Sequence, residues 1–230
     1  MKVHRFLTEY KEIGNNVFIE NTDLIHQIKN VLKLRMGEKI ILTDGVGKNI
    51  HITLTEISKD SIVGSVVERV ISEKPSHKVH LYLSILKKEN FELVAQKVTE
   101  VGVASINPIE SDRTVKTGLK EERLKTIIKE ALEQSGGSYL PTLEEKTNLT
   151  EALKNSPGEK YLLDMTGIPF DDLEEIPEAG SIFVGPEGGW TENEIHTAKD
   201  TGVQIVSTGN STLRAETAAI ISSFLFVNKK

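Results

Sequence analysis

The segment from residue 181 to residue 227 constrains the fold most, because it contains two successive units of strand, glycine turn and helix. In the first unit the apolar run Ser181–Val184 ends at Gly-Pro-Glu-Gly-Gly, residues 185–189, and a capping-box pattern predicts a helix directly after it. In the second unit Val203–Val206 leads through a polar turn into an apolar helix that starts at Ala215. We expect two neighbouring parallel strands with both turns at their carboxyl ends, the edge where open α/β sheets bind ligands.

These two turns do not match the common phosphate-binding loops. The first is neither G-x-G-x-x-G nor G-x-x-x-x-G-K-S/T, and Glu187 places a carboxylate where a phosphate needs amides or a lysine. Glycines at 185, 188, 189 and 209 would take positive φ and let the main chain approach a flat ligand closely. Such a lining suits S-adenosylmethionine, with its adenine, sulfonium and amino groups. The simpler interpretation, a turn that only reverses the chain, is weakened by the second turn.

Motifs along the whole chain resemble those of one family. The sequences 185–189 and Leu213-Arg214-Ala215-Glu216-Thr217-Ala218 look like the paired signature of the SPOUT (α/β-knot) methyltransferases, specifically of the ribosomal RNA small subunit methyltransferase E family. The other similar positions are, in order, Arg5-Phe6, His26 with Val31-Leu32, Lys97 with Glu100 and Gly102, Glu110–Arg113 and Glu130–Ser135. Matches in this order are more specific than one motif.

The resemblance implies a fold, an activity and partners. Family members methylate N3 of a uridine in 16S rRNA of the small ribosomal subunit, with S-adenosylmethionine as cofactor, and form homodimers. The implied α/β architecture is a small N-terminal PUA-like β-barrel that helps to hold RNA, followed by a parallel-sheet domain with a deep trefoil knot. Pattern alone would exclude the knot, because threaded chains are rare.

The turns and the resemblance together give the candidate site residues. The cofactor-binding candidates are Leu163, Met165, Gly185, Pro186, Glu187, Gly188, Gly189, Thr208, Gly209, Thr212 and Leu213, where the loop that contains Met165 is a third wall by resemblance. The RNA-binding candidates are Arg5, His26, Lys29, Lys33, Arg35, Lys97 and Arg113. The catalytic candidates are Arg214 and Glu216.

The catalytic candidates follow from the implied reaction. Methyl transfer from a sulfonium is an in-line displacement, so the protein has to align the acceptor with the methyl carbon and exclude water. The proton on uridine N3 must also leave, which requires a base or a cation that stabilises the anion. Arg214, between the second turn and the last helix, is the candidate cation. Glu216 either caps that helix or orients Arg214.

Two of the RNA-binding candidates lie in the second half of the predicted fold, and one of them has a plainer explanation. Lys97 and Glu100 lie three residues apart on a predicted helix, which is the spacing of an exposed ion pair, whereas the resemblance places them near the active-site cleft. Arg113 follows the predicted strand Ala104–Ile109. Its place at a strand's carboxyl end makes it a candidate contact for phosphate or substrate.

The net charge and the distribution of charge along the chain give opposing indications about nucleic-acid binding. The formal net charge of −6 disfavours nucleic acid, which proteins bind largely by neutralising phosphates. Residues 1–74, however, hold 11 basic and 10 acidic residues, whereas residues 75–230 hold 17 and 24. Lys29, Lys33, Arg35 and Lys39 could form a basic face, although a solvated surface explains the same cluster. The resemblance favours RNA.

Composition excludes several kinds of site. With no cysteine, the chain has no disulfide, thiolate metal site or cysteine nucleophile. Its six histidines lack metal-ligand spacing, so we expect no metal. No apolar run reaches the length of a membrane span, and the N-terminus does not lead into a signal-peptide core. We therefore expect a cytoplasmic protein without membrane contact.

Patterning places a domain boundary after residue 74. Residues 1–74 predict five or six short strands and one helix, capped by Asp23, as in a small barrel, and Lys74-Pro75-Ser76 predicts a linker. From Val79 onward, apolar strands alternate with helices, one of which ends at Gly136-Gly137. We expect a PUA-like domain over residues 1–74 and a knotted methyltransferase domain over residues 75–230.

Three positions depart from the family pattern. Gly137 and Tyr139 stand where members usually carry arginine, and Lys33 where arginine is common. Lysine lacks the bidentate fork of arginine for phosphate, so RNA affinity and target choice are affected. Two alternatives stay open: a related methyltransferase acting on another RNA or on a ribose 2′-OH, and a catalytically reduced RNA-binding assembly factor.

Overall fold

The chain folds into two compact units in the computed structural model, which describes residues 3–115, 118–173 and 177–229. The first unit comprises Met1–Lys74 and Leu132–Leu140, and the second Pro75–Ala131 and Pro141–Lys230. A single boundary at 74/75 is therefore incomplete. Residues 132–140 join the first unit because their main chain bonds to its loop: Gly47 N donates to Ser138 O (2.9 Å) and Leu140 N to Gly45 O (2.8 Å).

The first unit contains a six-stranded sheet in the order β1-β4-β5-β6-β3-β2. Its strands are β1 (His4–Leu7), β2 (Lys11–Ile13), β3 (Asn16–Ile19), β4 (Lys39–Thr43), β5 (Lys48–Ile57) and β6 (Ile62–Ile71). β1 pairs with β4 in parallel, and the other ladders are antiparallel. Within the described residues no ladder joins β1 to β2, so hydrogen bonds do not close the predicted barrel.

One short helix covers the core of this sheet. α1 (Thr22–His26) continues into a π-helical turn, η1 (Gln27–Val31). The side chain of Asn21 accepts the hydrogen bond from Leu24 N at 2.9 Å, so Asn21 is the helix cap and the prediction of Asp23 was wrong by two positions. Leu24, Ile25 and Ile28 are buried against apolar residues of the strands, since they lie on one face of the helical segment.

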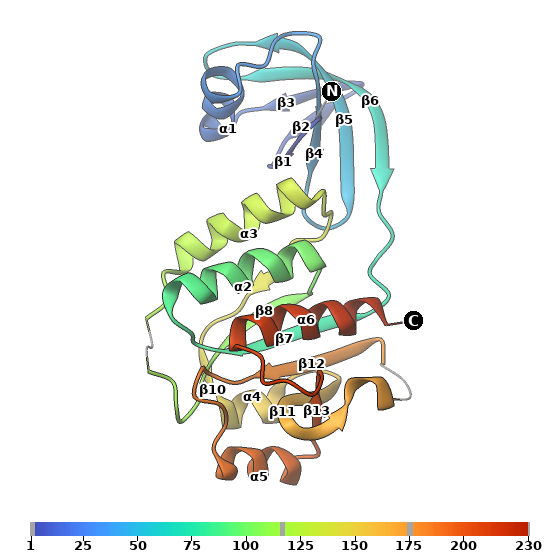
Figure 1. Cartoon of the computed structure of the whole chain (residues 1–230). Coiled ribbons are helices and arrows are strands. Elements are labelled where there is room, and N and C mark those ends of the chain that lie inside the picture. Colours follow the sequence, from blue (N-terminus) through green and yellow to red (C-terminus); the bar gives the residue numbers. More distant parts are fainter. Residues whose placement is uncertain (1–2, 116–117, 174–176, 230) are drawn as a thin grey trace. The chain divides into compact units, whose positions relative to one another are not determined.

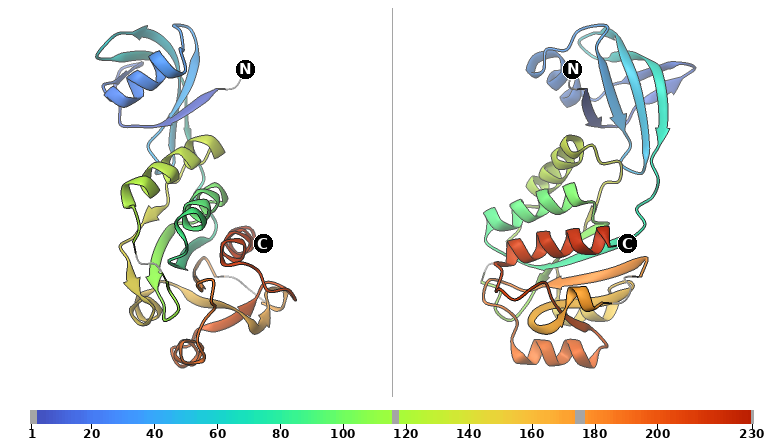
Figure 2. Two further views of the ribbon diagram at one scale, coloured as in Figure 1. Left: turned by 60° about the vertical axis from the view of Figure 1, so that its left-hand side comes forward. Right: turned by 45° about the vertical axis from the view of Figure 1, so that its right-hand side comes forward.

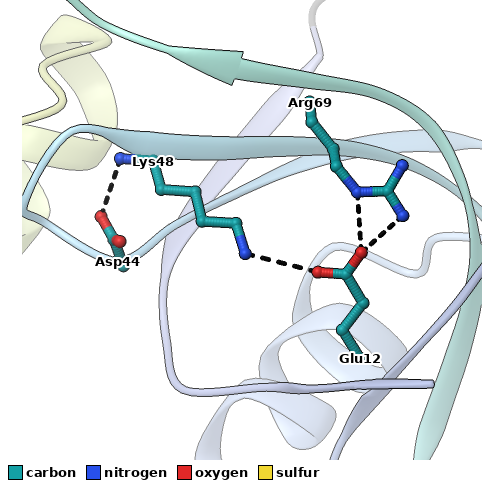
Figure 3. A network of polar contacts seen from close by, with 4 residues as sticks. All are labelled: Glu12, Asp44, Lys48 and Arg69. Carbon is teal, nitrogen blue, oxygen red and sulfur yellow. Dashed lines mark hydrogen bonds and ion pairs between the residues drawn. The ribbon is translucent and has the colours of Figure 1, made fainter. Parts of the chain in front are cut away.

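A carboxylate and two cations tie three strands of the first unit together (Figure 3). Arg69 Nε on β6 donates to Glu12 Oε1 on β2 at 2.7 Å, and Lys48 Nζ on β5 donates to Glu12 Oε2 at 3.3 Å. The Lys48 main chain also donates to Asp44 Oδ1 at 3.0 Å. Glu12 therefore links β2, a strand of three residues, to the long hairpin of β5 and β6.

The second unit is built on a parallel sheet in the order β10-β8-β7-β12-β11-β13, with β9 also paired to β8. Its strands are β7 (Lys78–Ser84), β8 (Ser105–Glu110), β9 (Thr142–Leu143), β10 (Thr147–Asn148), β11 (Glu159–Pro169), β12 (Ala179–Val184) and β13 (Gln204–Ser207). Every ladder in the described part of this sheet is parallel. The mixed α/β fold agrees with the prediction, and the trefoil knot stays a prediction.

Helices cover both faces of the parallel sheet. They are α2 (Lys88–Val101), α3 (Glu121–Ser135), α4 (Leu149–Asn155), α5 (Glu192–Asp200) and α6 (Ala215–Asn228), with a short 3-10 turn, η2 (Phe170–Asp172). α2 and α6 lie side by side on one face, and α4 and α5 lie on the other (Figures 1 and 2). Successive side chains of β7 point to opposite faces of the sheet, so this strand contributes to the apolar core on each face. Leu81 packs in the core beneath α2 and α6, and Tyr82 packs in the core beneath α4 and α5.

Candidate active site

A cavity of about 590 Å³ lies where loops of the second unit meet at the carboxyl ends of the strands. Both signature sequences line it, together with the start of α2 and the β11 loop, which denotes the bulge of β11 between Leu163 and Ile168. The sequence-predicted residues that line it are Leu163, Met165, Gly185, Pro186, Glu187, Gly188, Gly189, Thr208, Thr212, Leu213, Arg214 and Glu216. Gly209 is not in the lining, although its neighbour Thr208 is. Pattern had not singled out Lys87, Asn90 or Asp164, which also line the cavity.

The two signature turns do not follow neighbouring strands. β11 lies between β12 and β13, so the predicted adjacency was wrong. The order has a structural consequence: the loop of β11 comes between the two turns as the third side of the cavity. β11 bulges there, since both Leu163 and Ile168 pair with Val206 of β13.

The first turn is fixed by its neighbours. Trp190 Nε1 donates to Leu163 O at 3.0 Å, which joins this turn to the β11 loop. Arg113 Nη1 donates to Gly188 O at 2.8 Å and to Trp190 O at 3.2 Å. Gly189 takes a φ of 69°, whereas neither Gly185 nor Gly188 lies in the left-handed region. The expectation of positive φ therefore fails at 185 and 188, and a Cβ at 185 would instead crowd the Trp190 ring at 3.0 Å.

Glu187 acts on the protein's own main chain. Its Oε1 accepts a hydrogen bond from Lys87 N, at the N-terminus of α2, at 3.2 Å. Sequence reasoning had offered this carboxylate to a ligand amino group or positive centre. In the structure one of its oxygens links the first turn to α2.

The capping box of α5 also supports the site. Thr191 and Glu194 form the predicted reciprocal pair, with Thr191 N donating to Glu194 Oε2 at 2.8 Å. Glu194 is buried, and its other oxygen accepts from Asp112 N at 2.9 Å. Sequence reasoning found the cap from its spacing. It missed the link to the loop of Asp112 and Arg113, because nothing local encodes that contact.

Arg214 and Glu216 stand at the start of α6 with different environments. Arg214 is the N-cap residue, and its side chain is 87% exposed. Its Nη1 lies 3.9 Å from Glu216 Oε1, whose side chain is only 12% exposed. Glu216 Oε2 is buried and accepts no hydrogen bond from the described residues. A carboxylate in a helix's first turn is favoured by the helix dipole, but this oxygen still lacks a donor.

Three of the RNA-binding candidates are engaged by other residues of the protein. Arg5 donates to Asn49 Oδ1 at 2.7 Å and to Gly137 O at 3.1 Å, so it holds residues 132–140 within the first unit. Lys97 pairs with Glu100 at 2.8 Å and is absent from the lining of the cavity, which favours the plainer explanation. Arg113 holds the first turn, as described above.

The other four RNA-binding candidates form a basic segment in the first unit. His26, Lys29, Lys33 and Arg35 are exposed, and their side chains make no hydrogen bond or ion pair with the described residues. Lys33 has a φ of 53°. Among the described residues it is the only residue other than glycine in the left-handed region. Lys33 directly follows Leu32, the C-cap of η1, where chains commonly adopt this conformation.

The departures from the family pattern have structural roles here. Tyr139 donates its hydroxyl to Ser72 O at 2.9 Å and lies against Gly47, where a Cβ would come within 2.4 Å of that hydroxyl. Gly137 presents its carbonyl to Arg5. These two positions therefore contribute to packing within the first unit.

The described ranges offer neither a metal site nor a membrane-spanning helix. No group of three or more His, Asp or Glu side chains there could hold a metal ion. None of the helices there is both long enough and apolar enough to cross a bilayer.

Comparison with known proteins agrees with this geometry. Residues 72–226 match the RNA methyltransferase domain, and residues 20–67 match the RNA methyltransferase PUA domain. The chain is 31% identical to the ribosomal RNA small subunit methyltransferase E of Mesomycoplasma hyopneumoniae, over 95% of this chain and 96% of that protein. It is 29% identical to ribosomal RNA small subunit methyltransferase E 2 of Borreliella burgdorferi, over 93% and 91%.

A solved structure is similar over nearly its whole length. It is a ribosomal RNA small subunit methyltransferase E from Neisseria gonorrhoeae bound to S-adenosyl methionine, with a TM-score of 0.88 and 29% identity, covering 96% of this chain and 95% of that one. A PUA domain joined to a parallel-sheet domain with this loop cavity defines an RNA methyltransferase enzyme of the SPOUT type. Within that class, the chain belongs to the ribosomal RNA small subunit methyltransferase E family. The family resemblance seen in the sequence is confirmed.

Proposed function

We propose that this chain methylates N3 of a uridine in 16S rRNA of the small ribosomal subunit, in the cytoplasm, with S-adenosylmethionine as the methyl donor. One observation carries the proposal: a single cavity is lined by both signature sequences and by the loop of β11. Relatives named for methylation of small-subunit ribosomal RNA, over more than nine-tenths of this chain, support the choice of substrate.

The residues of the cavity fit S-adenosylmethionine. Its lining combines the carboxylates of Asp164, Glu187 and Glu216 with two cations, Lys87 and Arg214, and this mixture suits a ligand with a sulfonium, an ammonium and a carboxylate. The buried Oε2 of Glu216 lacks a donor, as expected of a group whose partner arrives with a ligand or substrate. The bound cofactor supplies a methyl carbon activated by positive sulfur. We assign its binding to the predicted cofactor residues, with Gly209 at the margin.

Arg214 and Glu216 are proposed to handle the proton and charge of the acceptor base. The exposed guanidinium of Arg214 can turn toward uracil O2 or O4 and stabilise the N3 anion as the proton leaves. Glu216 Oε2 accepts the N3–H hydrogen bond and then takes the N3 proton, while its Oε1 keeps Arg214 close. The N3 lone pair then forms the new bond to the methyl carbon while the carbon–sulfur bond breaks, leaving a neutral thioether.

RNA binding is proposed to rest on the first unit, the PUA-like domain. The basic segment of His26, Lys29, Lys33 and Arg35 offers its charge to phosphates because no described side chain neutralises it. Arg113 and Arg5 act indirectly in this scheme. Arg113 positions the first signature turn, Arg5 fixes residues 132–140, and Lys97 is a surface pair.

A homodimer is proposed through α6. Thr217, Ile221 and Phe224 follow one stripe of this helix, and Ile221 and Phe224 are 38% and 55% exposed. An exposed aromatic residue beside an exposed aliphatic one is typical of an interface core.

The test is methylation of small ribosomal subunits isolated from a strain that lacks the gene. The wild-type chain should produce one new N3-methyluridine in 16S rRNA, identified by mass spectrometry of nucleosides. Arg214→Ala should bind S-adenosylmethionine within a few-fold of wild type and lose at least about 100-fold in turnover. In the same assay, Lys29→Ala with Lys33→Ala should raise KM for the subunits and leave kcat largely unchanged. The matched control, Lys11→Ala, removes a lysine that Glu20 already neutralises.

The outcomes separate the candidates. A ribose-methylated product, or methylation of a different RNA only, would replace the proposed substrate but keep the cofactor site. No calorimetric binding of S-adenosylmethionine by the wild-type chain would contradict the proposal as a whole. Turnover of Arg214→Ala equal to wild type would remove that residue from catalysis.

A further inference from the structure

A second hollow, of about 620 Å³, lies on the sheet of the second unit and shares no lining residue with the active-site cavity. Its floor is made by His80 and Tyr82 of β7 and by Ser105 and Asn107 of β8, which are cross-strand partners in register. Residues of α4 and of segment 142–147 form its walls. Nothing in the proposed methyl transfer uses this hollow.

The floor is polar where a parallel sheet is normally apolar. Strands of a sheet covered on both faces read as continuous hydrophobic runs. Here Ser105 and Asn107 are buried and form a fixed network: Asn107 Nδ2 donates to Leu81 O at 3.1 Å and to Ser105 Oγ at 2.7 Å, and His80 Nδ1 lies 2.8 Å from Ser105 Oγ. Both amide hydrogens of Asn107 are thereby used inside the protein, and its orientation is set.

Two acceptors of this floor remain without partners in the protein. Asn107 Oδ1 accepts no hydrogen bond from the described residues. Tyr82 is only 8% exposed and stacks on Phe183 with ring centroids 4.7 Å apart, yet its hydroxyl has no hydrogen-bond partner in the described part of the chain. Both residues line the hollow, and neither atom is among the fully buried unpartnered atoms of the described residues, so a ligand or water in the hollow can supply the missing partner.

The charge around the hollow is negative. Glu144, Glu145 and Glu151 line it, and the lining includes no lysine or arginine. The Glu144 carboxylate lies close enough to contribute to the raised pKa of Tyr82, whose main cause is burial. Burial also lowers the pKa of His80, with a contribution from the nearby Lys78, so that imidazole is neutral near pH 7. Lys146 is occupied by Glu110 at 2.6 Å. A phosphate would be repelled here.

We propose that this hollow binds an ammonium or guanidinium group, with Asn107 Oδ1 and the Tyr82 hydroxyl as hydrogen-bond acceptors and Glu144 as the counter-charge. Such a group carries several N–H donors and a positive charge, which matches unused acceptors beside carboxylates. A metal ion fits less well, since the described Glu and His side chains here do not converge as ligands. The cation can come from a free polyamine or from a lysine or arginine side chain of a protein.

The test uses the intact chain, with spermidine and arginine amide as separate probes at low salt, followed by NMR titration and by thermal unfolding. Tyr82→Phe removes only a hydroxyl that has no partner in the protein, so the variant should fold and unfold as wild type without a probe. Both Tyr82→Phe and Glu144→Gln should weaken binding by about tenfold. Glu130→Gln, an exposed change outside the hollow, is the matched control and should bind as wild type.

The two probes distinguish the sources of the cation. Binding of spermidine alone points to a free polyamine, and binding of arginine amide points to a protein side chain. Equal binding by wild type, Tyr82→Phe and Glu144→Gln would overturn the proposal. An equal loss of probe binding in Glu130→Gln would also overturn it, as would displacement of the probe by Mg²⁺ at similar concentrations. Either result would mean that the probe is attracted by the net negative charge of the protein and not by a specific site.

Discussion

At the scale of single residues, Gly167 has the least room of any glycine around the active-site cavity. A Cβ at this position would lie 2.4 Å from Val206 N and 2.5 Å from Ile205 C, which are main-chain atoms of β13 and cannot rotate away. Gly167→Ala must therefore push the bulge of β11 away from β13. We expect a loss of about 1–3 kcal/mol in the free energy of unfolding. We also expect roughly tenfold weaker binding of S-adenosylmethionine, measured by chemical denaturation and by calorimetry.

Gly118→Ala is the matched control for this change. Gly118 belongs to the same unit, has no atom within 4 Å of an added Cβ and does not have positive φ. The Gly118→Ala variant should lose neither stability nor affinity for S-adenosylmethionine. If Gly167→Ala bound the cofactor as wild type despite a loss of stability, the β11 bulge would not be a wall of the cofactor site.

Sequence reasoning named most of the residues that line this cavity, but with a partly wrong physical reason. The glycines of the first turn were identified by their motif, but the steric need at 185 comes from the ring of Trp190, five residues on, and at 167 from β13. Likewise, the motif found Glu194 as a cap and could not find its bond to Asp112. Contacts between residues far apart in sequence leave no local pattern, so only the fold reveals them.

At the scale of elements, the short strand β2 depends on Glu12. Its carboxylate is held by Arg69 and Lys48, and the hydrogen bond from Arg69 is the main reason that the pKa of Glu12 lies below its ordinary 4.5. A carboxyl whose pKa is lower in the folded state stabilises that state above the unfolded pKa. This stability is lost as the pH falls through the folded pKa. Glu12→Gln should therefore lower the thermal midpoint of the first unit near neutral pH.

The difference between Glu12→Gln and wild type should shrink as the pH is lowered, since wild-type Glu12 becomes protonated as well. Differential scanning calorimetry of the intact chain at several pH values gives this comparison. Glu20→Gln is the control, because Glu20 forms an exposed pair with Lys11 alone, and such pairs contribute little. A pH-independent deficit in Glu12→Gln would show that the variant disturbs packing instead of charge.

Most elements were predictable because their signals are local. The short strands predicted within residues 1–74 are present as β1 to β6. The helix predicted to end at Gly136-Gly137 corresponds to α3, and the helix predicted after the first turn corresponds to α5. The order of the parallel strands was not predictable in the same way. Pattern placed β12 beside β13, whereas β11 separates them. Strand order is decided by packing of the whole sheet, which no segment encodes alone.

At the scale of the whole molecule, the proposed dimer depends on a helix that is apolar on its exposed side as well as its buried side. α6 buries Ala219 and Phe226 and leaves Phe224 55% exposed. Single exposed apolar residues are common, but a contiguous apolar patch marks an interaction site, and Phe224 lies one turn from Ile221, which is 38% exposed. Internal packing, the other explanation for an apolar final helix, accounts for Phe226 but leaves Phe224 unexplained. The exposed side therefore favours a second copy of the chain.

Phe224→Asp tests this inference. A charge in the centre of an apolar interface should raise the dimer dissociation constant by at least about 30-fold, which corresponds to a change of roughly 2 kcal/mol. Sedimentation equilibrium over a range of concentrations measures it. Val115→Asp is the control, because Val115 is 89% exposed in the same unit and should tolerate the same change. A wild-type chain that stays monomeric at every concentration, or a Phe224→Asp variant as dimeric as wild type, would rule out α6 as the dimer interface.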